Sequence, residues 1–428
     1  MHFPGTRLLL FSGFTQASQI FSQTPLDNIC KFGEKDTLLE RTQAILEDNQ
    51  GVCGSSRKQF ESKVHNPWTQ RPICMPQTSS NQTYCVYTHK NHANGRGITF
   101  LTSPDVERTL VNEPYFAQKF PPHVNNFSNP PYEVRNVPGR GNGLYATRQI
   151  ELGEVIVAET PVGIFQSDAF PHDKALKYQY INAAFKSLPS ETQEAFMKMA
   201  AMHGGKEDEI TERIHTNSFH GEFAGLEHFM VFPQTAFMNH DCRPNGMYFF
   251  DPNTLIKSTH AARTILPGEE LTINYISLLR PHKERQEHLL DVWGFKCTCD
   301  LCSASQGKIQ ISDFRIQQIR YIHDGLADWS AGSYATTAMA EWLIELYEEE
   351  HLWASRPISY VFAALAYNGV GDAEKARAFA IKSLETGMIN RGVNKEMGPG
   401  NNNDIADMQA IIKDPKSHWT WMARPLKG

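Results

Sequence analysis

An apolar run long enough to cross a bilayer is what this sequence most clearly lacks. No stretch of the 428 residues approaches the roughly 18 apolar residues that a spanning helix needs, so we expect no membrane span. Basic residues are not in excess either: 41 Lys and Arg stand against 47 Asp and Glu, a formal net charge of −6. Because nucleic-acid binders present a basic surface, this balance disfavours direct sequence-specific nucleic-acid binding. It is compatible with a basic peptide partner, and the chain is expected to be a monomer.

A targeting sequence is only weakly indicated at the N-terminus, in residues 1–24. Arg7 precedes a short apolar stretch and small residues, which is a weak version of a secretory signal. A frayed terminus is the alternative. Two N-glycosylation sequons, at Asn81 and Asn126, lean slightly towards secretion. Localisation therefore stays open between the secretory pathway and the nucleus or cytoplasm.

The first four of the eight cysteines have no metal-site spacing. Cys30, Cys53, Cys74 and Cys85 are separated by 22, 20 and 10 residues and contain no CxxC pair, which is poor for zinc. In an oxidising compartment they would form two disulfides, and three pairings are open. Four unrelated thiols are the alternative.

The other four cysteines predict a structural zinc site. The segment GFKCTCDLC (residues 294–302) carries Cys297, Cys299 and Cys302, and the only further cysteine in that half is Cys242, in NHDCRPN. Together they supply the four thiolates of a closed tetrahedral site, which leaves no position for a catalytic water. The segment must then fold back over residues 239–245. A reactive thiol cluster is the alternative.

The chain divides into regions of different periodicity. Residues 25–125 are expected to form an irregular, cysteine-containing N-terminal region, with a linker at 123–133. Residues 130–277 alternate short strands with glycine turns, interrupted by a helical insertion at about 166–216. In that insertion Ser190 is the expected N-cap of a helix, and Gln193 its capping-box partner. The fold class is therefore α+β.

The rest of the chain, residues 307–428, is expected to be helical. Residues 364–385 resemble one tetratricopeptide (TPR) helix pair, and an ordinary helical hairpin is the alternative. The acidic run at 341–353 is most simply the solvated face of a helix, with attraction of basic substrates as an alternative role.

Taken in order, five motifs resemble one family, the SET-domain protein-lysine methyltransferases. They are GRGNGLYA (139–146), NSF (217–219), NHDCRPN (239–245), GEELTINY (268–275) and GFKCTCDLC (294–302). The resemblance implies a SET β-fold over 130–277, followed by a post-SET zinc segment at 278–306. The helical insertion and tail resemble the SMYD subgroup. That subgroup's MYND zinc module has no counterpart, since residues 165–216 contain no cysteine, which resembles fungal members of the family.

The resemblance also implies a cofactor, S-adenosylmethionine. Glycines in the first motif let the backbone pass close to a ligand, a plain tight turn being the alternative. The amide of Asn239 would bind the amino-acid end, the backbone of His240 would reach adenine, and Phe295 would stack on it under the zinc segment. Phe295 as a core residue is the alternative. The implied cofactor contacts are Arg140, Gly141, Asn142, Gly143, Asn217, Asn239, His240, Tyr275 and Phe295.

Tyr275, at the end of GEELTINY, takes the family's catalytic position. Methyl transfer needs a neutral amine, whereas free lysine has a pKa near 10.4, and a narrow apolar channel lowers that pKa. Tyr275 would orient the amine, and Phe219 would line the channel. The leading hypothesis is a protein-lysine N-methyltransferase acting on a lysine-containing protein or peptide. The alternative is a catalytically silent SET fold that serves as a binding module. Asp241 and Asn274 depart from the usual pattern.

Overall fold

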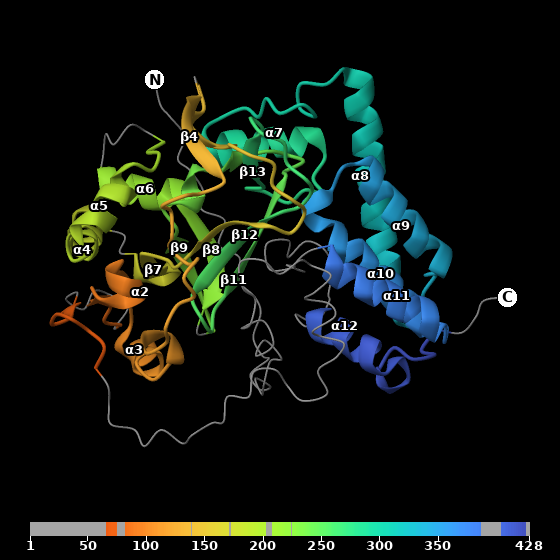
Figure 1. The fold of residues 1–428 in the computed structure, drawn as a ribbon, viewed down its shortest axis with the longest axis horizontal. Helices are drawn as coiled ribbons and strands as arrows, with labels where there is room; N and C mark the ends of the chain where they lie inside the picture. The colour runs from red at the N-terminus through yellow and green to blue at the C-terminus, as the bar shows by residue number, and fades with distance from the viewer. Residues whose placement is uncertain are drawn as a thin grey trace.

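The computed structural model describes residues 66–74, 82–137, 139–170, 173–202, 208–223, 225–386 and 404–424. A β-rich body lies between two helical regions (Figure 1). The expectations for residues 1–24, for the Asn81 sequon, and for Cys30 and Cys53 fall outside the described residues. Across the described part of the chain, no helix is both long and apolar enough to traverse a bilayer.

A six-stranded sheet forms one half of the β-rich body. Strands β3 and β7 run parallel, and all other neighbours are antiparallel. In spatial order the strands are β1 (Ile73–Cys74), β2 (Cys85–His89), β3 (Ile98–Thr102), β7 (Gly163–Gln166), β9 (Leu226–Val231) and β8 (Ser218–Phe223). One disulfide joins Cys74 to Cys85 across the β1–β2 pair.

The expectation of an irregular N-terminal region is wrong for residues 85–110. Strands β2 and β3 and the helix α3 (Pro104–Leu110) are regular structure, and the short turn labelled α2 (His92–Gly95) joins the two strands. All five residues of β3 are buried, so the strand shows no polar–apolar alternation that would reveal it. It pairs with β7 more than sixty positions later, and local patterns do not predict such a pairing.

Two smaller sheets carry the motifs of the second half of the chain. The four-stranded sheet has the order β10 (Asn239–His240), β13 (Glu270–Ile273), β5 (Gly141–Ala146) and β4 (Tyr132–Val137). The three-stranded sheet has the order β11 (Gly246–Asp251), β12 (Ile256–Ala261) and β6 (Val155–Glu159). Strand β10 is parallel to β13, with His240 opposite Ile273. This pairing brings NHDCRPN beside the end of GEELTINY.

The helical insertion is present as expected. It consists of α4 (Lys174–Lys186), α5 (Ser190–Met197) and α6 (Glu209–Asn217). The predicted cap is wrong: α5 begins at Ser190 itself, and Pro189 precedes it with φ −58° and ψ 149°. The Gln193 side chain donates to the carbonyl of Leu188 at 2.7 Å instead of closing a capping box.

The C-terminal region is helical and packs directly on the β-rich body (Figure 1). Leu278 and Leu279, just after β13, share one hydrophobic cluster with these helices. Helix α7 (His282–Trp293) leads to the region, whose helices are α8 (Gln306–Ala327), α9 (Thr337–Glu349), α10 (Arg356–Gly369), α11 (Ala373–Glu385) and α12 (Asp404–Lys413). Short 3-10 turns lie at Pro114–Phe116, Ser167–Ala169, Thr235–Phe237, Trp353–Ser355 and Pro415–Ser417.

Candidate active site and zinc centre

Tyr275 lies two residues beyond the end of β13, and a hydrogen bond fixes its hydroxyl group. The phenolic O–H donates to the carbonyl of Met238 at 3.0 Å, and Met238 immediately precedes β10. Burial raises the pKa of Tyr275 above its usual value. The phenol is therefore protonated across the physiological range, and it can donate a hydrogen bond but cannot serve as a base.

His240 is buried between Tyr275 and the cysteine cluster. Its Nδ1 accepts a hydrogen bond from the Tyr275 backbone N–H at 3.1 Å, so the ring proton of the neutral imidazole is on Nε2. Nε2 lies 3.4 Å from the Cys242 sulfur. Burial lowers the pKa of His240 to about 4, which keeps the imidazole neutral. The expected backbone contact of this residue with adenine remains a prediction.

Two half-buried aromatic residues complete the surroundings of Tyr275. The Trp293 ring centroid lies 5.5 Å from that of Tyr275, and the Phe295 centroid lies 6.5 Å from it at 84°. Sequence reasoning singled out Phe295 and missed Trp293. The signal was there, in an aromatic residue two positions before Phe295. Between them Gly294 adopts φ 71° and ends α7, a conformation that favours glycine.

The four predicted cysteines come together as expected. The ligand atoms of Cys242, Cys297, Cys299 and Cys302 all lie within 4.8 Å of one another. The Cys242 sulfur is 4.0 Å from that of Cys297 and 3.6 Å from that of Cys302. Zinc–sulfur bonds of about 2.3 Å at tetrahedral angles place sulfurs about 3.8 Å apart. The cluster therefore fits a tetrahedral tetrathiolate zinc ion.

The glycine motif lies on β5 beside β13 and contacts β10. Gly141 has φ 77°, and a Cβ there would meet nothing within 4 Å, so the surface in front of it is open. A Cβ on Gly143 would lie 2.8 Å from a Glu270 oxygen and 3.0 Å from the Asn239 amide. The need for glycine at Gly143 thus comes from neighbouring side chains of the protein.

Glu270 organises the polar residues around this turn. It accepts from the Asn239 amide at 2.8 Å and pairs with Arg140 at 3.0 Å. Asn239 also donates to the Asn142 carbonyl at 3.3 Å. Arg140, Asn142 and Asn239 therefore lie together on one side of the turn. Asn217 is elsewhere engaged, since its amide donates to the carbonyls of Ala200 and Arg213.

Phe219, on β8, packs in a group of aromatic rings. Its centroid lies 5.4 Å from that of Tyr248 and 5.7 Å from that of Phe232, both nearly perpendicular. Phe219 and Tyr275 both pack against one hydrophobic cluster of buried residues. The Nζ atom of the buried Lys257 lies 2.6 Å from the Phe219 centroid. Sequence reasoning missed this lysine, whose pKa burial lowers well below its usual value.

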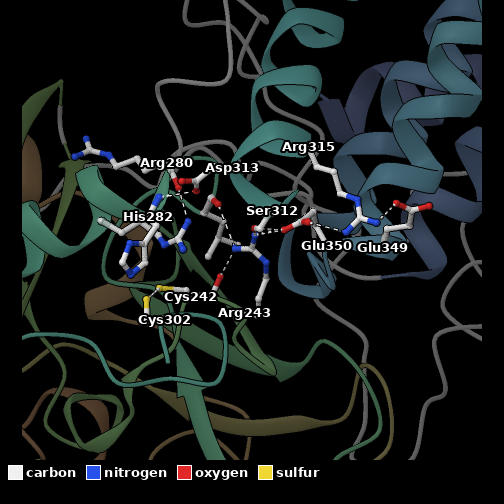
Figure 2. Close-up of polar contacts among 12 residues, drawn as sticks. Cys242, Arg243, Arg280, His282, Cys302, Ser312, Asp313, Arg315, Glu349 and Glu350 are labelled. Atoms are coloured by element: carbon white, nitrogen blue, oxygen red, sulfur yellow. Dashed lines mark hydrogen bonds and ion pairs between the residues drawn. The ribbon is translucent and has the colours of Figure 1, made fainter. Parts of the chain in front are cut away.

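Arg243, the residue after Cys242, joins this loop to the C-terminal helices. Arg243 donates to the Glu350 carboxylate at 2.6 Å, and the two side chains are only 10% and 3% exposed. Ser312, on α8, donates to the same carboxylate at 2.6 Å. Figure 2 shows this network beside Cys242 and Cys302. The acidic run at 341–353 suggested a solvated helix face, but its residue Glu350 is buried.

Asp241, which departs from the family pattern, is held inside the same loop. Its carboxylate accepts from the Arg243 backbone N–H at 2.7 Å. Burial, reinforced by the negative charge of the Cys299 thiolate, raises the pKa of Asp241 to about 6. The side chain therefore shapes the loop, with its carboxylate turned to the backbone.

Several known proteins are similar in sequence to this chain. Residues 141–276 match the SET domain family. The histone-lysine N-methyltransferase set5 of Schizosaccharomyces pombe is 29% identical over 69% of this chain and 88% of its own length. The N-lysine methyltransferase SMYD2-A of Danio rerio is 28% identical over 34% of this chain and 37% of its own length. The N-lysine methyltransferase SMYD2 of Homo sapiens is 33% identical over 23% of this chain and 24% of its own length.

These similarities define the class of protein. Residues 141–276 match the SET domain, and the chain is similar to proteins named histone-lysine and N-lysine methyltransferases. It matches most of the length of the yeast relative, but well under half of the SMYD2 proteins.

Proposed function

We propose that this protein is a protein-lysine N-methyltransferase that uses S-adenosylmethionine. The observation that carries the proposal is the position of Tyr275, with its hydroxyl fixed on the Met238 carbonyl and Trp293 and Phe295 around its ring. S-adenosylmethionine, when bound, supplies a sulfonium methyl group. The chain's own residues must bind it, exclude water and deliver a neutral lysine amine.

The side of β5 at the glycine motif supplies the proposed cofactor contacts. Arg140 and Asn142 flank Gly141, whose surface is open, and Asn239 lies next to them. Guanidinium and amide groups suit the charged amino-acid end of the cofactor. Phe295 is only half buried, and the exposed part of its ring is proposed to stack on adenine. Asn217 remains a proposed contact, through atoms other than its engaged amide N–H groups.

The substrate lysine is proposed to enter between Phe219, Tyr275 and Trp293. Aromatic walls exclude water and disfavour the ammonium, so the amine reaches the site neutral. The Tyr275 hydroxyl, protonated and fixed, orients the lone pair. Such orientation provides a large part of the catalysis in this kind of transfer. The aromatic faces also favour a methylated ammonium product by cation–π attraction.

The cysteine cluster is proposed to bind one structural zinc ion. Four thiolates fill a tetrahedral shell, and three of them are on the segment that carries Phe295. Zinc would therefore fix this aromatic lid to the loop of Asn239 and His240. We further propose residues 130–277 as the SET domain, 278–306 as the post-SET segment and 307–428 as a TPR-like domain. In the α10–α11 hairpin of that domain, Ala364, Ala376 and Ala380 are fully buried.

Calorimetry with S-adenosylmethionine tests the proposal first. The folded, zinc-loaded protein should bind the cofactor with one site per chain. Transfer of a radiolabelled methyl group to core histones and to an array of lysine peptides then tests the reaction. Folded, zinc-loaded protein that does not bind S-adenosylmethionine would contradict the enzyme proposal and leave a silent SET fold.

A further inference from the structure

Glu270, the first residue of β13, carries a carboxylate that contacts two of the proposed cofactor residues at once. Its Oε1 accepts from the Asn239 amide at 2.8 Å, and its Oε2 lies 3.0 Å from an Nη1 of Arg140. The side chain is only 13% exposed, and hydrogen bonds shielded from water are stronger than those in bulk solvent. Glycine at position 143 leaves room for the carboxylate, because a Cβ there would lie 2.8 Å from Oε1.

The side chain of Glu270 is not needed to build the turn before β13. That turn is held by the neighbouring Glu269, whose carboxylate accepts from Arg263 at 2.8 Å and from the Leu266 backbone N–H at 2.8 Å. Glu270 contributes to the local structure through its backbone carbonyl, which accepts from the Asn245 amide at 2.8 Å. The two adjacent glutamates therefore divide the work, and the Glu270 carboxylate is turned towards the glycine motif.

Glu270 fixes which way the Asn239 amide faces. The side-chain nitrogen of Asn239 donates to Glu270 and, at 3.3 Å, to the Asn142 backbone carbonyl. An ionised carboxylate and a backbone carbonyl only accept hydrogen bonds, so the nitrogen, and not the oxygen, must face them. The amide oxygen of Asn239 therefore points away from Glu270. Because that oxygen can only accept, a ligand group that binds it must be a donor.

Arg140 offers the opposite chemistry at the second oxygen of Glu270. A guanidinium has five N–H donors and no acceptor, and the Arg140 side chain is 38% exposed. It therefore keeps donors for a ligand carboxylate, which a guanidinium can bind through two parallel hydrogen bonds. The charges of Glu270 and Arg140 cancel, so this pair suits a ligand group with one positive and one negative charge. The α-ammonium and α-carboxylate of S-adenosylmethionine form such a group.

We infer that Glu270 is a positioning residue that sets the polarity of the cofactor site. It turns the oxygen of Asn239 towards the α-ammonium of S-adenosylmethionine and holds Arg140 for the α-carboxylate. The inference rests on the proposed function, and it deepens that function by assigning each charged group of the cofactor to one side chain. Glu270 acts through Asn239 and Arg140 and not by touching the cofactor.

Affinities for two ligands test the inference without a methyl-transfer assay. S-adenosylmethionine carries the charged amino-acid end, whereas 5′-methylthioadenosine shares its adenosine part and lacks that end. Both are titrated into zinc-loaded, full-length wild type, Glu270→Gln and the control Glu133→Gln, whose carboxylate is 51% exposed in the same sheet. Calorimetry measures tight binding, and ligand-observed NMR measures weak binding.

The expected loss is selective. Glu270→Gln should lose about 10- to 100-fold in affinity for S-adenosylmethionine, the effect of weakening hydrogen bonds to a charged group. It should keep the wild-type affinity for 5′-methylthioadenosine, because the adenosine part is bound elsewhere. Glu133→Gln should match wild type with both ligands.

The two ligands separate positioning from a general effect on the fold. Wild-type affinity of Glu270→Gln for S-adenosylmethionine, or equal losses for the two ligands, would overturn the inference. If Glu270→Gln fails to fold, Glu270→Asp, which keeps the charge but shortens the reach to Asn239 and Arg140, is judged by the same comparison. Wild type that binds neither ligand would instead refute the proposed function, and this inference with it.

Discussion

Cys242 and Tyr275 contact opposite nitrogens of one imidazole. The Cys242 sulfur lies 3.4 Å from Nε2 of His240, and the Tyr275 backbone N–H donates to Nδ1 at 3.1 Å. The Tyr275 contact fixes the tautomer, so the Nε2 proton points at the sulfur. The proposed metal ligand and the proposed catalytic tyrosine therefore cannot move independently.

Tyr275→Phe should reduce methyl transfer by on the order of 10²-fold, the size of effect expected from poor alignment of reacting groups. The substitution removes only the hydroxyl that donates to the Met238 carbonyl. Cofactor affinity, measured by calorimetry on the same preparation, should change little. Turnover at the wild-type rate would show that the chemistry lies elsewhere.

Cys242→Ser should release the zinc ion. Three thiolates on the closing segment remain, but the site loses the ligand that joins it to β10. Because binding of structural zinc is coupled to folding, stability should fall with metal content. Asp300→Asn, an exposed change between Cys299 and Cys302, is the matched control and should keep its zinc. Metal analysis that finds full zinc in Cys242→Ser contradicts the assignment.

Phe295→Ala should weaken cofactor binding and leave the zinc in place. Stacking of a base on an aromatic ring contributes roughly 1–3 kcal/mol, or about ten- to hundredfold in affinity. All four thiolates remain in the variant. Calorimetry and metal analysis together check both halves of the expectation, and unchanged affinity with full zinc would make Phe295 an ordinary packing residue.

Glu350→Gln should destabilise the protein far more than Glu349→Gln. Glu350 is 3% exposed and neutralises the buried Arg243, and breaking such a pair costs about 3–5 kcal/mol. The neighbouring Glu349 is 54% exposed in its ion pair with Arg315, where a pair contributes about 0–1 kcal/mol. Urea unfolding of both variants measures the difference, and equal stabilities would show that the buried network does not brace the loop.

His92→Leu should make the protein less sensitive to acid. Burial, with a contribution from His89, lowers the pKa of His92 to about 3 from 6.5. Between these values the unfolded chain binds the extra proton, so stability present at neutral pH falls as pH drops below 6.5. The loss between pH 7 and 5.5 should be smaller in the variant by about 1 kcal/mol. Chemical unfolding at the two pH values checks this, and identical losses would contradict it.

The sequence predicted the second half of the chain better than the first. Counting cysteines was enough to pair Cys242 with a cluster 55 positions away, because a zinc site must be filled. Strand β3 was missed because its partner β7 is distant in the chain and both of its faces are buried.

The sequence also did not predict which charged residues are buried. Arg285 and Glu350 sit in helical sequences where charge normally marks the solvated face. Only the fold shows that Arg285 is fully buried and that Glu350 pairs with Arg243. Trp293 was missed although the sequence shows an aromatic residue two positions before Phe295; only the fold shows that its ring lies 5.5 Å from that of Tyr275.

The separation of Cys242 from its three partners also sets an order of events during synthesis. At roughly 5–20 residues per second, the ribosome needs roughly 3–11 s to extend the chain by the 55 positions from Cys242 to Cys297. The last strand of the six-stranded sheet, β9, ends at Val231, so that sheet is complete in sequence before the metal cage exists. A nascent chain that stops before Cys297 would contain Asn239, His240 and Tyr275. It would lack the three cysteines that are proposed to fix the lid above these residues. The proposed zinc site can therefore be completed only after Cys302 has been added, and the supply of zinc would then decide when the proposed lid is fixed.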